Sequence, residues 1–229
     1  ISAINEVMAF KNKIDIVITD HHQPSAVLPE ACAVINPKRP ECTYPDKNLA
    51  GVGVAFKLCQ ALWSMLRTDE SHIFEYLDFV AIGSIADIVP LLGENRILVK
   101  HGLEQLASTT NQGLNALLKS CKLEAIDAGK VGFIIAPRLN AAGRIGLGTV
   151  GVELLLTEDN DYAGELAVYL EQQNTQRQAL EKEILAAAES LLTEYDFQNN
   201  KVIVLSGTGW HSGVIGIVAS RLVGKYYRP

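Results

Sequence analysis

The sequence lacks two features that would place it in a membrane or a secretory route. It has no uninterrupted apolar run of about 18 residues, and no basic and apolar leader with a small-residue cleavage site at its beginning. Its four cysteines form no C-x-x-C pair or other zinc-ligand spacing. We therefore expect a cytoplasmic protein without disulfides or structural zinc, whose cysteines serve as small buried residues.

An excess of basic residues is also missing. The chain has 20 Lys and Arg against 26 Asp and Glu, which gives a net charge of −6. Proteins that wrap nucleic acid usually cluster lysine and arginine, so this balance argues against a broad nucleic-acid surface. Phosphate chemistry is not excluded, because carboxylates that hold metal ions add negative charge while the ions reverse the local field.

What the sequence does have is the composition of a globular domain, with 48% hydrophobic residues in a chain of 229. Short β-branched and apolar runs predict buried strands at residues 14–19, 32–35 and 201–205. A helix is predicted before the first strand, over residues 1–12. Strands that alternate with helices indicate an α/β protein with a parallel or mixed sheet flanked by helices.

Apolar residues at three- and four-residue spacing predict further helices over residues 50–67, 72–82, 95–107, 112–120, 128–140, 159–195 and 213–227. Asp159 or Asp161 could cap the long helix, and Ser212 could cap the last one. The long helix would measure about 50 Å, so we expect it to connect two domains rather than fill a core. The predicted division is a first domain over 1–157, a connecting helix over 158–196 and the start of a second α/β domain over 197–229.

Two sets of polar residues are candidates for metal chemistry. Asp20, His21 and His22 stand where the first strand ends, which is where ligands gather in open α/β sheets. Imidazole and carboxylate together suit Mn²⁺ or a similar ion, although two surface histidines would look the same in sequence. Asp87 lies among apolar neighbours, where an unpaired carboxylate would be costly. It could cap a helix, pair with Arg96 or supply a metal ligand from a second segment.

At these residues the chain resembles a known family. The segment Thr19 to Pro24 resembles the third motif of the DHH phosphoesterase superfamily, and Gly83 to Leu91 with Glu94-Asn95-Arg96 is similar to its fourth motif. Two further stretches, residues 136–144 and 209–222, resemble the single-stranded-DNA exonucleases of that superfamily. The second of these resembles the opening of the DHHA1 domain, so the resemblance covers essentially the whole chain.

Roles for the metal candidates follow from this resemblance. His21, His22 and Asp87 would be catalytic, with His21 and Asp87 as direct metal ligands. His22 would face the substrate phosphate or a second ion. Asp20 would orient the imidazoles, because ligating histidines usually give their other N–H to a carboxylate or carbonyl.

The resemblance also implies residues that bind substrate: Arg138, Asn140, Arg144, His211, Ser212 and Arg221. Guanidinium groups suit phosphate oxygens, and a glycine-rich turn that enters a helix offers free amides to an anion. Surface salt bridges remain the alternative for Arg138 and Arg144. We expect Trp210 to pack under the turn rather than to stack on a base.

The implied activity is hydrolysis of single-stranded DNA from its 5′ end, in repair and recombination, with two Mn²⁺ or Mg²⁺ ions. A single-strand-binding protein and a helicase are the implied partners. The first two family motifs, which carry further aspartates, have no counterpart in the sequence, so we expect the chain to be a piece that is inactive alone. Two alternatives stay open: a DHH phosphoesterase acting on oligonucleotides, cyclic dinucleotides or pyrophosphate, and a catalytically silent replication scaffold.

Overall fold

The structure is a computed structural model that describes residues 4–66, 70–123 and 125–229. The predicted helix ends at Ile1 and Arg67 lie outside these ranges. The chain divides into two compact units, residues 1–110 with 123–136 and residues 111–122 with 137–229. The domain boundaries predicted from the sequence stay a prediction. Within the described ranges, no helix is both long and apolar enough to cross a bilayer.

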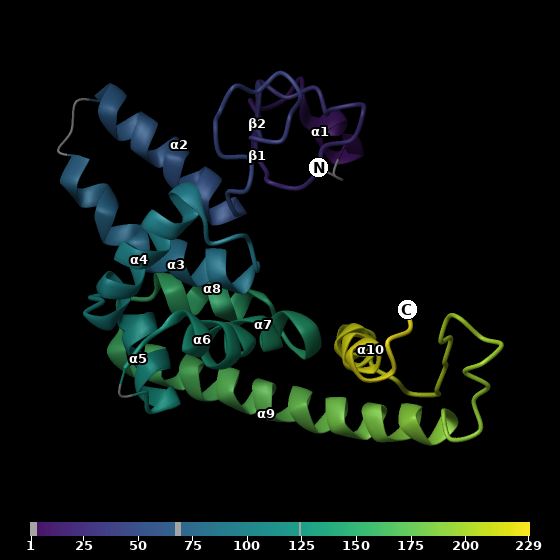
Figure 1. Ribbon diagram of the computed structural model, residues 1–229. Coiled ribbons are helices and arrows are strands. Elements are labelled where there is room, and N and C mark those ends of the chain that lie inside the picture. The colour runs from purple at the N-terminus through teal and green to yellow at the C-terminus, as the bar shows by residue number, and fades with distance from the viewer. Residues whose placement is uncertain (1–3, 67–69, 124) are drawn as a thin grey trace. The chain divides into compact units, whose positions relative to one another are not determined.

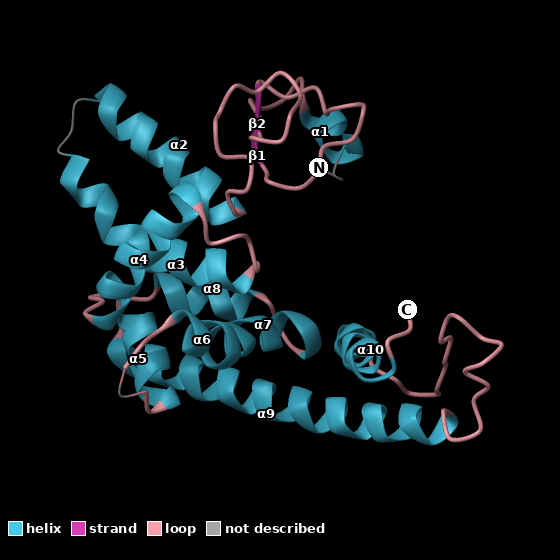
Figure 2. Cartoon of the chain, in the orientation of Figure 1, coloured by secondary structure: helices cyan, strands magenta, loops and turns pink. Residues whose placement is uncertain are grey.

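The first unit contains a small parallel sheet (Figure 1). β1 (Val17–Thr19) pairs with β2 (Ala33–Ile35), and Ile18 lies opposite Val34. α1 (Ile4–Phe10) precedes β1, as predicted. Figure 2 shows that helices make up most of the remaining regular structure. The predicted α/β class is confirmed, although the strands are shorter than their apolar runs and helices predominate.

Helices build the core of the first unit. They are α2 (Gly51–Leu66), η1 (Glu70–Tyr76), α3 (Leu77–Ala86), α4 (Gly93–Ala107), α6 (Ala128–Lys130) and η2 (Val131–Ile135). Buried apolar side chains form one cluster: Leu49, Val54, Phe56, Ile73, Leu77, Val80 and Leu98. α3 and α4 approach closely at Gly102, where an added Cβ would lie 2.1 Å from the Leu77 carbonyl oxygen. Only glycine permits this contact, which holds α3 in place.

The helix predicted over 128–140 is interrupted by a π turn before Pro137. In η2 the amide of Ala136 donates to the carbonyl of Val131, five residues back. Proline has no amide proton, and its ring crowds the carbonyl four residues earlier, here that of Phe133. The wider π turn accommodates the missing amide proton and the crowded carbonyl. The Phe133 side chain is 87% exposed.

The second unit is helical. It contains α5 (Gln112–Cys121), most of α7 (Ala136–Ile145), α8 (Thr149–Leu156), α9 (Asn160–Leu191) and α10 (Ser212–Tyr226). The carboxylate of Asp159 caps α9 by accepting the amides of Asp161 and Tyr162. The long helix and one of its two predicted caps are therefore confirmed. Its N-terminal half packs on α5 and α8, and α10 also contacts α9 within this unit.

Two predictions for the last segment are wrong. Residues 201–205 form no strand, because they have no partner strand among the described residues, and the amide of Ile203 donates to the carbonyl of Pro229 instead. Ile203 and Leu205 still pack against the buried cluster of α9 and α10, whereas Val202 and Val204 are exposed. The cap of α10 is His211 rather than Ser212, since His211 Nδ1 accepts the amide of Gly213 at 3.1 Å.

Asp78 is a buried charge on α3 that the metal-site hypothesis does not involve. It is 2% exposed and accepts a hydrogen bond of 2.6 Å from the hydroxyl of Thr109, together with one from the amide of Phe79. Burial raises the pKa of Asp78 above its ordinary value, against the opposing effect of these hydrogen bonds. The folded protein therefore binds this proton more tightly than the unfolded chain does.

The raised pKa makes the effect of an Asp78→Asn variant depend on pH. In the wild type, protonated Asp78 makes its full contribution to the free energy of unfolding below the ordinary aspartate pKa of about 4. This contribution is lost as pH rises through the higher pKa of the folded state. Asparagine does not titrate, so the free energy of unfolding of Asp78→Asn should rise relative to wild type between those values. Urea denaturation at several pH values measures this, with the exposed Asp15→Asn as control. A difference that does not change with pH would contradict the account.

Candidate metal centre and arginine cluster

Asp20, His21 and His22 follow directly after β1, at its carboxyl end. The amide of Asp20 donates to the carbonyl of Ile35 at 3.0 Å, which extends the pairing with β2 by one residue. Asn36, which follows β2, is 2% exposed and donates to the carbonyl of His22 at 2.9 Å. The ends of both strands thus hold the three residues in a fixed backbone conformation.

Asp20 organises the two histidines. Its Oδ1 accepts the amides of His21 at 2.7 Å and His22 at 3.1 Å, and it lies 2.8 Å from Nδ1 of the His22 ring. Burial acts to raise the pKa of Asp20, but these hydrogen bonds outweigh it and hold that pKa well below its ordinary value. Asp20 is therefore a carboxylate that accepts hydrogen bonds, and its contact with Nδ1 fixes the His22 ring.

Asp87 meets this group from α3. It is the C-cap residue directly after that helix, and its Oδ2 lies 3.3 Å from Nδ1 of His21. The C-terminus of a helix carries partial negative charge, which adds to the charge of the carboxylate and favours a cation nearby. Asp87 does occupy a cap position, one of its two structural alternatives, yet its carboxylate faces His21.

The start of α2 supports His21, a contact that sequence reasoning missed. An added Cβ on Gly51 would lie 3.2 Å from Cδ2 of the His21 ring, so the helix begins directly against the imidazole. The glycines of the segment Ala50 to Gly53 are the signal that could have indicated a close approach.

The donor set suits a divalent cation. Ligand atoms of Asp20, His21 and His22 lie within 4.8 Å of one another, and Asp87 adds a carboxylate beside His21. Imidazole and carboxylate without thiolate is the ligand chemistry of Mn²⁺ and related ions rather than of structural zinc. All four cysteines are free thiols. The prediction that they are buried is wrong, since Cys32 is exposed and the other three are partly buried.

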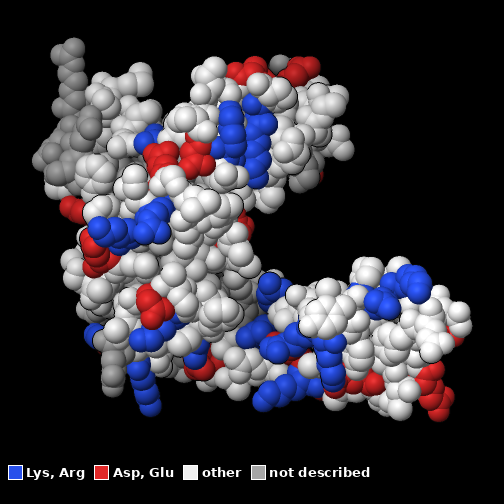
Figure 3. All heavy atoms as spheres, in the orientation of Figure 1, with Lys and Arg blue, Asp and Glu red and all other residues white. Residues whose placement is uncertain are grey.

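The second unit gathers arginines from α7, α9 and α10, and Figure 3 shows basic side chains there. Arg138 pairs with Glu171, while Arg177 and Arg221 both pair with Glu181, which is 4% exposed. Salt bridging, the alternative for Arg138, is thus present. Arg144 instead donates to the carbonyl of Gly213 at 3.2 Å and remains exposed.

Arg177 is the member that sequence reasoning missed. Burial lowers its pKa, and so do the neighbouring charges of Arg144, Arg221 and Arg138, against the opposing effect of Glu181. Among the described residues its buried Nε has no hydrogen-bond partner. These four guanidiniums, which we call the arginine cluster, exceed in number the two carboxylates that pair with them. The cluster therefore carries excess positive charge in an acidic protein.

The other predicted substrate residues have simpler surroundings. Asn140 on α7 and Ser212 at the start of α10 are exposed, and His211 is part-buried. Trp210 packs against the apolar cluster of α9 and α10, as predicted.

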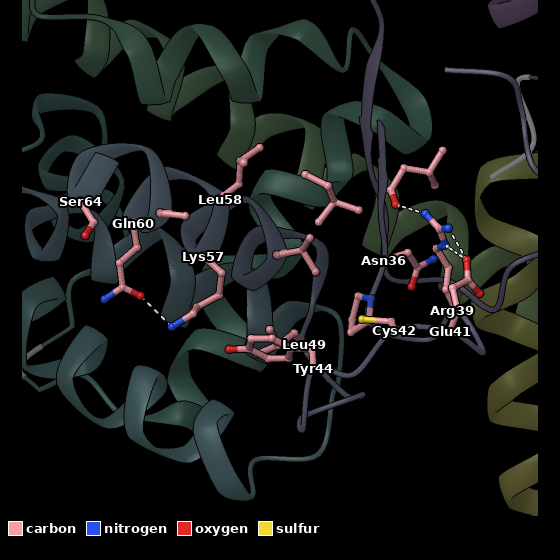
Figure 4. Close-up of a pocket in the computed structure, with 15 residues that line it drawn as sticks. Asn36, Arg39, Glu41, Cys42, Tyr44, Leu49, Lys57, Leu58, Gln60 and Ser64 are labelled. Carbon is pink, nitrogen blue, oxygen red and sulfur yellow. Dashed lines mark hydrogen bonds and ion pairs between the residues drawn. The ribbon is translucent and has the colours of Figure 1, made fainter. Parts of the chain in front are cut away.

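A cavity of about 820 Å³ lies between β2 and α2 in the first unit (Figure 4). Apolar side chains such as Leu49 and Leu58 form much of its wall, and Lys57 donates to Gln60 within it. Asn36 also lines it, and this residue holds the His22 carbonyl. None of the metal candidates lines the cavity, so it lies beside the centre rather than forming it.

Comparisons with known proteins show what the chain is similar to. Residues 1–84 match the N-terminal domain of the DHH family. The chain is 44% identical to the single-stranded-DNA-specific exonuclease RecJ of Bacillus subtilis, over 100% of this chain and 29% of that protein. It is 39% identical to RecJ of Escherichia coli, over 94% of this chain and 40% of that protein.

Solved structures give the same relationship. A crystal structure of RecJ from Thermus thermophilus in complex with Mn²⁺ matches with a TM-score of 0.88 and 38% identity, over 100% of this chain and 34% of that one. A crystal structure of exonuclease RecJ bound to manganese matches with a TM-score of 0.87 and 37% identity, over 100% of this chain and 57% of that one. The chain spans less than half the length of the RecJ proteins of Bacillus subtilis and Escherichia coli that it matches.

The close contact between α7 and α10 allows us to predict how substitution of Gly213 changes stability. An added Cβ there would lie 2.2 Å from the carbonyl oxygen of Arg144. Gly213→Ala should therefore force α10 away from α7 and lower the thermal midpoint. Gly216→Ala, on the same helix with open space around it, should raise stability by about 0.5–1 kcal/mol. Calorimetry measures the thermal midpoint of both variants, and equal changes in Gly213→Ala and Gly216→Ala would disprove the close contact.

Proposed function

From the match of residues 1–84 to the DHH family and the similarity of the whole chain to RecJ exonucleases, we propose that the chain is part of a metal-dependent exonuclease. The proposed substrate is single-stranded DNA, degraded from its 5′ end in repair and recombination. The observation that carries the proposal is the approach of Asp87 Oδ2 to within 3.3 Å of His21 Nδ1. An imidazole and a carboxylate at this separation can share one cation.

We assign His21 and Asp87 as ligands of Mn²⁺ or Mg²⁺, with Asp20 orienting the imidazoles. When bound, such an ion neutralises charge on a phosphate and makes water more acidic. The His22 ring, whose side chain is 73% exposed, faces solvent where a substrate phosphate or a second ion would lie. His21, His22 and Asp87 are the proposed catalytic residues.

The arginine cluster is proposed to hold the DNA backbone. Guanidiniums bind phosphate oxygens in a fixed fork geometry, and Arg144 and Arg221 keep exposed side chains for this purpose. Asn140, His211 and Ser212 are proposed to assist. The local excess of positive charge answers the objection raised by the net charge of −6. By resemblance alone, a single-strand-binding protein and a helicase are the proposed partners.

The metal assignment predicts the effect of Asp87→Asn in the complete nuclease. Loss of even an outer hydrogen-bond partner of a metal ligand costs about 10–100-fold in affinity, so loss of a ligand should weaken Mn²⁺ binding at least tenfold. Paramagnetic resonance titration measures this, with Asp15→Asn as the matched control from the same unit. Equal Mn²⁺ affinity and equal DNA cleavage in both variants would contradict the assignment of Asp87, and absence of DNA cleavage in the wild type as well would favour a catalytically silent scaffold.

The 229-residue chain by itself should bind Mn²⁺ weakly and should not cleave DNA, because His21 and Asp87 are too few ligands to hold two ions. The same titration applies to it. Clear turnover by the purified chain would contradict the two-metal proposal.

The arginine assignment predicts a change in salt dependence. Each phosphate contact on a single strand contributes about 0.7 to the slope of log affinity against log salt concentration. Arg144→Gln in the complete nuclease should lower the slope by about that amount. Fluorescence anisotropy with a labelled single strand measures it, and Lys119→Gln, an exposed cation on α5, is the control. An unchanged slope for Arg144→Gln would remove this residue from the DNA contact.

A further inference from the structure

We propose that Asn95 is a positioning residue that sets the separation of His21 and Asp87. This inference rests on the proposed function, because it concerns how the chain holds the two assigned ligands. Asn95 lies in the first turn of α4, and its hydrogen bonds within the described part of the chain go to Asn48 and Pro90 rather than to His21 or Asp87. Its effect is exerted through the two loops that it joins.

A single buried amide links those loops. Asn95 is 0% exposed, and its Nδ2 donates to the carbonyl of Asn48 at 2.8 Å and to the carbonyl of Pro90 at 3.1 Å. Asn48 lies three residues before Gly51, which abuts the His21 ring. Pro90 lies three residues after Asp87. The Asn95 side chain therefore links the loop before α2, whose first residue contacts His21, to the segment that carries Asp87.

A second residue strengthens the same junction. Asp46 Oδ1 accepts the amide of Asn48 at 2.9 Å, and its Oδ2 accepts the amide of Glu94 at 3.3 Å. The loop before α2 is thus held to the start of α4 at both Asp46 and Asn48. Because α4 packs closely on α3, the loop and Asp87 share one rigid frame.

The segment that Asn95 holds is strained. Ile88, directly after Asp87, has a φ of +56°, in the left-handed region that β-branched residues rarely adopt. Its side chain is 88% exposed, so packing does not compensate for the conformation. Strain of this kind persists only where neighbouring contacts over-determine it. The hydrogen bond from Asn95 to Pro90 is such a contact.

Stability alone does not account for Asn95. Among the described residues, its Oδ1 is buried without a hydrogen-bond partner, which costs free energy. An apolar residue of similar size would avoid that cost. What it would not do is hold the carbonyls of Asn48 and Pro90 at fixed positions.

The test compares Asn95→Leu with Thr109→Val, which removes another buried hydrogen bond of the same unit, the one to Asp78. The first readout is amide hydrogen exchange in the metal-free protein at Asp87, Ile88 and Val89, whose amides donate to carbonyls at the end of α3. These amides should exchange faster in Asn95→Leu than in Thr109→Val at matched stability. The second is Mn²⁺ affinity of the complete nuclease, which should fall about tenfold only in Asn95→Leu.

Recovery of Mn²⁺ affinity in a double variant distinguishes positioning by Asn95 from a purely structural role of this residue. Adding Ile88→Gly to Asn95→Leu removes the conformational strain, because glycine adopts a positive φ freely. Mn²⁺ affinity should then recover in part although no stabilising contact has been added. Should Asn95→Leu fail to fold, Asn95→Ser, which is too short to bridge both carbonyls, takes its place with the same expectations.

The inference is overturned if the three amides exchange no faster than in Thr109→Val, or if Mn²⁺ affinity is unchanged. Its failure is distinguishable from failure of the proposed function. If the wild-type nuclease binds no Mn²⁺, the metal proposal fails, while unchanged exchange at residues 87–89 refutes the role of Asn95 whether or not metal binds.

Discussion

The approach of Asp87 to His21 is the constraint on which the candidate site depends. These residues are about 65 positions apart in sequence, and they meet because β1 and α3 end at the same place. A carboxylate beside an imidazole at a helix C-terminus concentrates negative charge, which a cation would balance. The glycine contacts at Gly51 and Gly102 serve this meeting by letting α2 reach His21 and α4 reach α3.

Much of the helical structure follows from local sequence. The spacing of apolar residues and the cap at Asp159 define α9 because both signals act within a few residues. Residues 201–205 were predicted wrongly because a strand needs a partner that its own sequence does not specify. The π turn before Pro137 was missed because apolar periodicity predicts a continuous helix and does not register the crowded carbonyl of Phe133.

The candidate site, like the fold, could be predicted from the sequence only in part. Asp20, His21, His22 and Asp87 could be named as candidates from the sequence because imidazole and carboxylate groups are chemically distinctive. Arg177 could not, since an arginine on a helix is usually an ordinary surface residue. Asn95 belongs to the segment that resembles the fourth motif, but nothing in the sequence indicates the role proposed for it. Their importance comes from burial and from partners distant in sequence, Glu181 for one and Pro90 for the other in the folded chain.

Crystallography with Mn²⁺ of the full-length protein that contains this chain, using anomalous scattering to locate the ions, tests the central claim most directly. The account predicts one ion bound by both His21 and Asp87, at about 2.0–2.3 Å from a ring nitrogen and a carboxylate oxygen, the distances usual for divalent ions with these ligands. Ions found only at sites that exclude either residue would contradict it.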